Sequence, residues 1–144
     1  MKEPTLIELT AYDPHYHHAI EELLAQLTPH PLPMSEAQLR RVVEDAASHL
    51  YLLLAAGRVV GMLTLGLYHS PTGAKGWIED VVVHSSERGL GYGKILVQHA
   101  IDEARKAGVA QLMLTSNPLR IAANHLYQTM GFQRKETNCY RMVL

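Results

Sequence analysis

The chain has 144 residues, of which 47% are hydrophobic and 19% charged, and its formal net charge is −1 at pH 7. This length and composition are typical of a globular protein, so we expect a single domain over residues 1–144 with one core. A charge so close to zero gives no electrostatic case for nucleic acid or an anionic membrane as partner, and no apolar run is long enough to span a bilayer.

Hydrophobic periodicity and turn residues divide the chain into alternating strands and helices. Asp13-Pro14 has the N-cap and first-turn proline of one helix, and Ser35 with Gln38 forms a capping box for the next. The expected elements, in chain order, are strand 6–9, helix 14–27, a helix after residue 35, strands 50–55, 58–68 and 77–84, a helix after residue 93 that ends at Gly108, strand 111–115, a helix started by Asn117-Pro118 that ends before Gly131, and strand 140–144. This order predicts a mixed α/β sandwich with a mostly antiparallel sheet flanked by helices.

The most informative segment is a strand that ends at Ser85-Ser86 and leads through a glycine-dense turn into a helix. Turns of this kind bind anionic phosphate, because glycines let main-chain N–H groups converge and the first N–H groups of a helix are unpaired. The residues expected to bind phosphate are Arg88, Gly89, Leu90, Gly91, Tyr92, Gly93 and Lys94.

The spacing of these glycines excludes two common nucleotide motifs. A dinucleotide fingerprint requires G-x-G-x-x-G, whereas here the glycines are two residues apart each time. A nucleotide P-loop requires four residues between its first glycine and a Gly-Lys pair, and a Ser or Thr directly after that pair. Only three residues separate Gly89 from Gly93, and Ile95 follows Lys94.

The turn matches a different pattern, Gln/Arg-x-x-Gly-x-Gly/Ala, through Arg88, Gly91 and Gly93. A second block, Thr115 to Phe132, is similar to Asn-x-x-Ala-x-x-Leu-Tyr-x-x-x-Gly-Phe, with Asn117 slightly upstream of its usual place. With both blocks present, nearly the whole chain resembles the GNAT superfamily of acetyl-CoA-dependent N-acetyltransferases. The strand Ile78-Glu-Asp-Val-Val-Val83 is similar to that of the amino-sugar-phosphate branch of that family.

The resemblance implies where acetyl-CoA would bind. In the family, the cofactor strand separates from its neighbour, and its main chain hydrogen-bonds the pantetheine arm; the matching residues here are Val81, Val82 and Val83. Asn124 and Asn117 are candidates for the pantetheine amide, although helix capping explains Asn117 equally well. Tyr127 occupies the family's tyrosine position near the CoA sulfur, where a phenol protonates the leaving thiolate; a packed core aromatic is the alternative.

Two adjacent acids, Glu79 and Asp80, interrupt an otherwise apolar strand. Because side chains alternate along a strand, we expect them to face opposite sides of the sheet. Carboxylates are rarely buried without a partner, so a structural ion pair is one reading of either residue. Their position just before the cofactor turn favours a second reading, in which Glu79, or else Asp80, serves the acceptor amine.

The histidines and the single cysteine carry weaker signals. His15, His17 and His18 lack the spacing and carboxylate of a metal site, so we expect solvated side chains and no metal. His84 is a further candidate base. Cys139 is expected to be a core or edge thiol, not a nucleophile. One cysteine and no leader-peptide pattern favour a reducing, cytoplasmic location.

The expected activity is transfer of acetyl from acetyl-CoA to the primary amine of a small hydrophilic molecule, by direct attack in a ternary complex. A peptide or protein amine is the first alternative, since the proline-rich loop 29–33 would leave an open groove. A non-catalytic acyl-CoA-binding module is the second. The resemblance also implies a homodimer.

Overall fold

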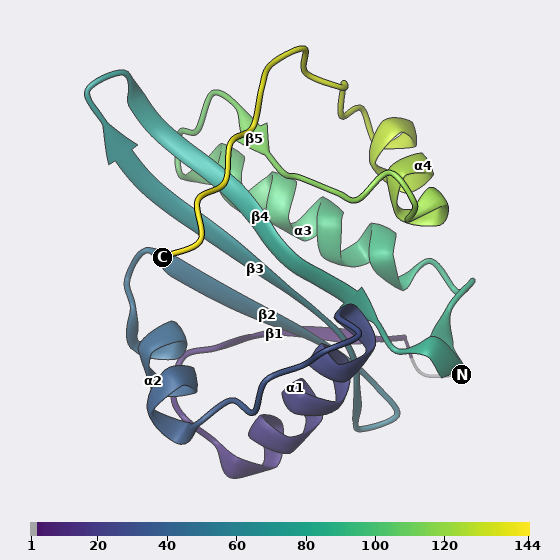
Figure 1. The fold of residues 1–144 in the computed structure, drawn as a ribbon. Helices are drawn as coiled ribbons and strands as arrows, with labels where there is room; N and C mark the ends of the chain where they lie inside the picture. The colour runs from purple at the N-terminus through teal and green to yellow at the C-terminus, as the bar shows by residue number, and fades with distance from the viewer. Residues whose placement is uncertain (1–2) are drawn as a thin grey trace.

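Five strands form one sheet in which the spatial order, β1-β2-β3-β4-β5, follows the order of the chain (Figure 1). The computed structural model describes residues 3–144. Its elements are β1 (Thr5–Leu9), α1 (Pro14–Leu27), α2 (Glu36–Glu44), β2 (Ser48–Ala55), β3 (Arg58–Ser70), β4 (Gly73–Val83), the 3₁₀ helix η1 (Ser85–Glu87), α3 (Tyr92–Lys106), β5 (Leu112–Met113) and α4 (Ile121–Thr129). The mixed α/β fold predicted from the sequence is therefore confirmed, but the C-terminal part differs in detail: the strand expected at residues 111–115 is limited to Leu112–Met113, and two further differences are described below.

Strands β1 to β4 form an antiparallel meander, and β5 joins it in the parallel direction after the crossover through α3. The β4–β5 pairing is short: its register contains only Gly76 opposite Leu112 and Trp77 opposite Met113. Beyond these two pairs, the second half of β4 has no strand partner on that side within residues 3–144.

Apolar side chains on the two faces of the sheet form two cores. One core lies beneath α1 and α2, where Ile20, Leu23 and Leu39 are buried against β2 and β3. The other lies beneath α3 and α4 and includes Leu96 and Tyr127. Figure 1 shows these two pairs of helices on opposite faces of the sheet. Within the described residues, no helix combines the length and hydropathy needed to cross a bilayer.

The helix starts predicted for the first half of the chain are confirmed. The Asp13 carboxylate accepts a hydrogen bond from the His15 N–H at 2.9 Å, and Pro14 occupies the first turn of α1. Ser35 and Gln38 form the reciprocal capping box of α2, with both of its hydrogen bonds present.

The last predicted strand, residues 140–144, is not formed. After α4 the chain continues to the C-terminus without helix or strand (Figure 1), and Tyr140, Met142 and Leu144 are exposed. A run rich in apolar residues resembles a strand, but a strand needs an edge with which to pair. The two-residue β5 offers almost none. Cys139 accordingly lies exposed in this segment and is neither a core nor an edge thiol.

The predicted start of the last helix is also wrong. The helix α4 begins at Ile121, not at Pro118, and Arg120 is its N-cap. The Asn117 side chain instead accepts a hydrogen bond from the Leu119 N–H at 2.9 Å, which closes a turn before the helix. An Asx turn and a helix cap use the same hydrogen bond from Asn to a nearby N–H, so the residue type alone does not separate them.

Candidate active site

The free edge of β4 is the centre of the candidate site. The carbonyl oxygens of Val81 and Val83 point away from β3, and each accepts a guanidinium hydrogen bond at 3.5 Å, from Arg120 and Arg88 respectively. The main chain of Val82 points the other way, toward β3, where its carbonyl lies against Gly61. Of the three valines selected from the sequence, only Val81 and Val83 thus present main-chain groups at the free edge.

A β-bulge interrupts β4 at Asp80. The β3–β4 register shifts there, from Thr64 opposite Glu79 to Met62 opposite Val82, and Asp80 has a left-handed φ of 52°. The bulge reverses the alternation of side chains, so that Ile78 packs toward α3 and Val82 toward α1. The regular alternation from which Glu79 and Asp80 were expected to face opposite sides of the sheet is therefore broken at this point of β4.

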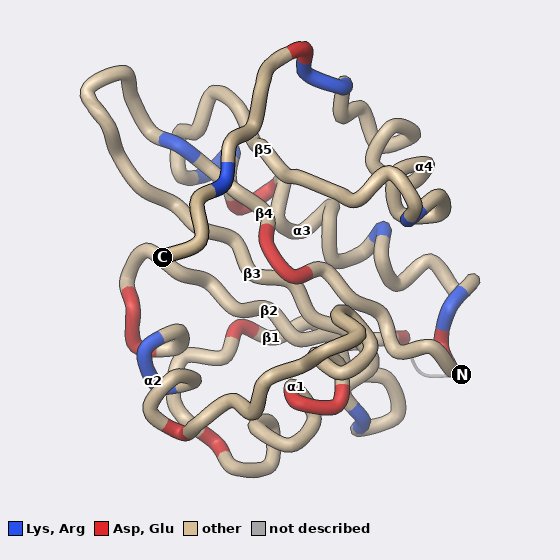
Figure 2. Tube along the Cα trace, viewed as in Figure 1, with Lys and Arg blue, Asp and Glu red and all other residues tan. Residues whose placement is uncertain are grey.

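Both carboxylates of the bulge are exposed, and neither forms an ion pair with any described residue. Figure 2 shows this acidic stretch near the middle of β4. Partial burial raises the pKa of Glu79, and the negative charge of Asp80 raises it further. A carboxylate with a raised pKa is a stronger base, and its exposure leaves it open to an approaching amine.

Tyr127 lies on α4, in the core beneath α3 and α4. Its side chain is 6% exposed, and its ring packs edge-on against Phe132 with the centroids 6.0 Å apart. The Tyr127 hydroxyl makes no hydrogen bond to a described residue. Every fully buried side-chain N or O atom of the described residues has a partner, so this hydroxyl must be in contact with solvent. Burial raises the pKa of Tyr127, while the positive charge of Arg120 acts in the opposite direction. The phenol therefore keeps its proton at neutral pH.

Asn124 and Asn117 build the loop before α4. The Asn124 side-chain amide donates to the carbonyl oxygens of Asn117 and Arg120, at 2.9 and 2.8 Å, and lies 3.3 Å from the Ser116 hydroxyl. Its two N–H groups are therefore committed to the loop, and only its oxygen is left for a ligand. These contacts hold Arg120, which the sequence analysis did not select, beside the edge of β4.

The turn after β4 presents a run of unpaired main-chain amides. Gln26 and His84 side chains accept from the Ser85 and Ser86 N–H groups, and the Glu87 N–H donates to the His84 carbonyl. From residue 88 to residue 94, by contrast, no main-chain N–H has an acceptor among the described residues. Gly91 adopts the left-handed conformation at φ 81° that turns the chain into α3, and no side chain caps that helix. Arg88 and Lys94 are exposed at either end.

Two histidines have roles that sequence reasoning did not predict. His17, expected to be solvated, accepts from or donates to Tyr12 through Nδ1 at 2.9 Å and lies 2.7 Å from the Met34 carbonyl through Nε2. It thereby ties the 28–35 loop to α1. His84 is a poor base candidate, because Nδ1 accepts the Ser86 N–H and Nε2 lies 2.9 Å from Glu22. The contacts with Met34 and Glu22 join residues that are far apart in the chain, so no sequence spacing predicts them.

Comparison with known proteins places this geometry in a family. Residues 13–132 match the model of the acetyltransferase (GNAT) family. Streptothricin acetyltransferase of Streptomyces lavendulae is 34% identical over 90 residues, which are 62% of this chain and 47% of that protein. Glucosamine 6-phosphate N-acetyltransferase of Trypanosoma brucei brucei is 31% identical over 123 residues, 80% of this chain and 81% of that protein. The crystal structure of a Trypanosoma brucei acetyltransferase superposes with a TM-score of 0.78 at 26% identity, covering 98% of this chain and all of the other.

Proposed function

Because the chain belongs to the acetyltransferase (GNAT) family and is an acyltransferase, we propose that it transfers acetyl from acetyl-CoA to the primary amine of a small hydrophilic molecule. The observation that carries the proposal is the free edge of β4, which lies between an exposed carboxylate at Glu79 and the run of unpaired amides at residues 88–94. Those main-chain amides could donate hydrogen bonds to the phosphates of a CoA thioester. The main chain at the free edge of β4 could form hydrogen bonds with the amides of its pantetheine arm.

The residues present fit acetyl-CoA. The N–H groups of residues 88–94, with Arg88 and Lys94, would bind its phosphates, because unpaired amides at a helix N-terminus and full positive charges both favour anions. The main-chain groups of Val81 and Val83 would pair with the pantetheine amides as a neighbouring strand would. The Asn124 oxygen is a further acceptor, in the loop that holds Arg120 at this edge.

Acetyl-CoA, when bound, supplies the acetyl group as a thioester with a thiol leaving group. An amine with a pKa near that of lysine, about 10.4, is protonated at neutral pH, so it must lose a proton before it can attack. The Glu79 carboxylate takes that proton, directly or through water. The Tyr127 hydroxyl gives a proton to the departing sulfur. A main-chain N–H at the free edge stabilises negative charge that develops on the carbonyl oxygen.

The acceptor class is proposed from the acids and from the relatives. Glu79 and Asp80 together offer two exposed negative charges to an ammonium group. Streptothricin and glucosamine 6-phosphate, named in the relatives, are small hydrophilic amines.

A thiol-release assay with a panel of amines tests the proposal. The panel should contain glucosamine 6-phosphate, streptothricin, a linear diamine and a short peptide with a free N-terminus, with the product of each checked by mass spectrometry. We expect acetylation of at least one small amine. Turnover of the peptide alone would favour a protein substrate, and acetyl-CoA binding without turnover of any amine would favour a binding module.

A further inference from the structure

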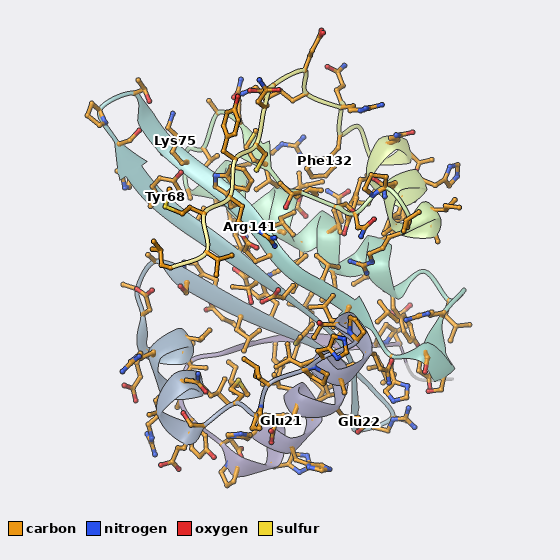
Figure 3. All side chains as sticks on the ribbon, viewed as in Figure 1. Glu21, Glu22, Tyr68, Lys75, Phe132 and Arg141 are labelled. Carbon is orange, nitrogen blue, oxygen red and sulfur yellow. The ribbon has the colours of Figure 1, made fainter. Side chains whose placement is uncertain are left out.

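The side chain of His84 joins three elements at the point where β4 ends. Its Nε2 lies 2.9 Å from the carboxylate of Glu22, a residue of α1 that is labelled in Figure 3. Its Nδ1 lies 3.1 Å from the Ser86 main-chain N and 2.8 Å from the Ser86 hydroxyl, within η1. The imidazole, whose side chain is 15% exposed, thus connects α1 and β4 to the turn that leads to the unpaired amides.

These contacts require one protonation state of the ring. A main-chain N–H can only donate, so Nδ1 must be unprotonated to accept it. The hydrogen bond from His84 lowers the pKa of Glu22, which therefore stays ionised and can only accept. The neutral imidazole with its hydrogen on Nε2 satisfies both partners at once.

Among the described residues, Nδ1 contacts only Ser86, whose hydroxyl could accept a hydrogen bond from a protonated ring but whose amide could not. Arg58 donates to the Ser86 hydroxyl at 2.9 Å and lies 3.6 Å from Glu87, and the charges of Arg58 and His18 act on Glu22. Because the Ser86 hydroxyl already accepts from Arg58, its own hydrogen is free to point to Nδ1. A hydroxyl can rotate when the ring takes a second proton, but the Ser86 amide cannot.

Protonation of His84 therefore has opposite effects on its two sides. The contact with Glu22 becomes an ion pair and persists, whereas the contact with the Ser86 amide is lost. The test below spans pH values within about pH 5 to 8, the range in which histidine side chains in general change charge.

We propose that His84 is a positioning residue for the acetyl-CoA turn: the neutral imidazole holds the Ser86 amide, and a second proton on the ring releases the turn and weakens acetyl-CoA binding. The inference rests on the proposed binding of acetyl-CoA at residues 88–94. Gln26 supports the same turn from α1 through the Ser85 N–H, at 2.7 Å, and does not titrate.

Two substitutions separate the two sides of the ring. In His84→Asn, the side-chain oxygen lies near the place of Nδ1 and still accepts the Ser86 N–H, but it does not titrate. In His84→Gln, the amide lies near the place of Nε2 and still donates to Glu22, but the Ser86 contact is lost. His69→Asn removes an exposed histidine on β3 and is the control.

Acetyl-CoA affinity should be measured by calorimetry at pH 7.5 and pH 5.5 for all four proteins. Each protein's loss of affinity is the ratio of its affinity at pH 7.5 to its affinity at pH 5.5. We expect this loss to be roughly fivefold larger for wild type and His69→Asn than for His84→Asn. His84→Gln should be weak at both values. The ligand's own phosphate monoester titrates near pH 6, but this effect is common to all four proteins and cancels in the comparison.

An NMR titration of wild type gives an independent readout. The Ser86 amide resonance should shift with the same midpoint as the His84 ring, and the shift should be absent in His84→Asn. Equal pH dependence of affinity in wild type and His84→Asn would overturn the role of His84 while leaving the proposed function intact. No binding by wild type at pH 7.5 would instead overturn the proposed function and this inference with it. If His84→Gln does not fold, wild type and His84→Asn still decide the question.

Discussion

The guanidinium of Arg120 donates a hydrogen bond to the main-chain oxygen of Val81, with Nη2 and the oxygen 3.5 Å apart. This contact crosses the opening between β4 and the loop before α4. At this point β4 is no longer paired with β5. The same guanidinium acts on the phenol of Tyr127, two helical turns further along α4. One exposed side chain therefore faces both the edge of β4 and the candidate acid.

Replacing Arg120 with Met should lower kcat roughly fivefold, the effect of losing about 1 kcal/mol of hydrogen bonding. Because Arg120 is exposed, the free energy of unfolding should change by less than about 0.5 kcal/mol. Steady-state kinetics and denaturant unfolding measure the two quantities. Arg120→Lys keeps the charge and is the control; a Met variant with wild-type kcat would show that Arg120 takes no part in the reaction.

Replacing Glu79 with Gln should lower kcat/KM for the acceptor and remove the acidic limb of its pH profile, with acetyl-CoA affinity unchanged. Gln keeps the size of the side chain but cannot take a proton from the amine. An ordinary glutamate has a pKa of about 4.3. Burial and the charge of Asp80 both raise the pKa of Glu79, so the acidic limb of the wild-type pH profile should lie at a higher pH than an ordinary glutamate would give.

Asp80→Asn is the matched variant for this limb. It removes the charge that raises the pKa of Glu79, so the limb should move to lower pH without disappearing, and Asn tolerates the left-handed φ of this position. An unaltered profile in Glu79→Gln would place the base elsewhere, with Asp80 next to be tested.

Replacing Tyr127 with Phe should lower kcat by roughly 10²–10⁴-fold and leave the Kd for acetyl-CoA nearly unchanged. The substitution removes only the hydroxyl, which makes no hydrogen bond to a described residue, so packing against Phe132 and the free energy of unfolding should be retained. Single-turnover kinetics and calorimetry test the two parts. A Phe variant as fast as wild type would return Tyr127 to a purely structural role in the core.

Replacing Gly91 with Val should weaken acetyl-CoA binding at least tenfold, or about 1.4 kcal/mol. A Cβ at this position meets no protein atom within 4 Å, so the effect comes from the φ of 81° and from the space beside the amides. Gly57→Val is the control, because Gly57 also has a positive φ, 75°, with nothing near its added Cβ, in the β2–β3 turn. Both variants should lose stability, and only Gly91→Val should lose affinity; equal affinities would refute the assignment.

Local signals in the sequence predicted the helix starts at Asp13 and Ser35, because a cap depends on residues within one turn. Failures came where distant residues decide the structure. The bulge at Asp80 depends on the register with β3, and the strand expected at residues 140–144 depends on an edge that β5 does not provide. The roles of His17, His84 and Arg120 depend on partners on other elements, so no local pattern identified them.

The short ladder between β4 and β5 also has a consequence for the order in which the chain assembles. Strands β2, β3 and β4 are joined to one another by short turns, whereas β1 pairs with β2 across a connection that contains α1 and α2, and β5 reaches the sheet only after the whole of α3. Pairings that close short loops form sooner than those that close long ones. We therefore expect the hairpins of β2, β3 and β4 to form first, and the opening beside β4 to be completed later, when β5 and α4 dock. A chain emerging from the ribosome would hold a nearly finished sheet well before it could retain a thioester.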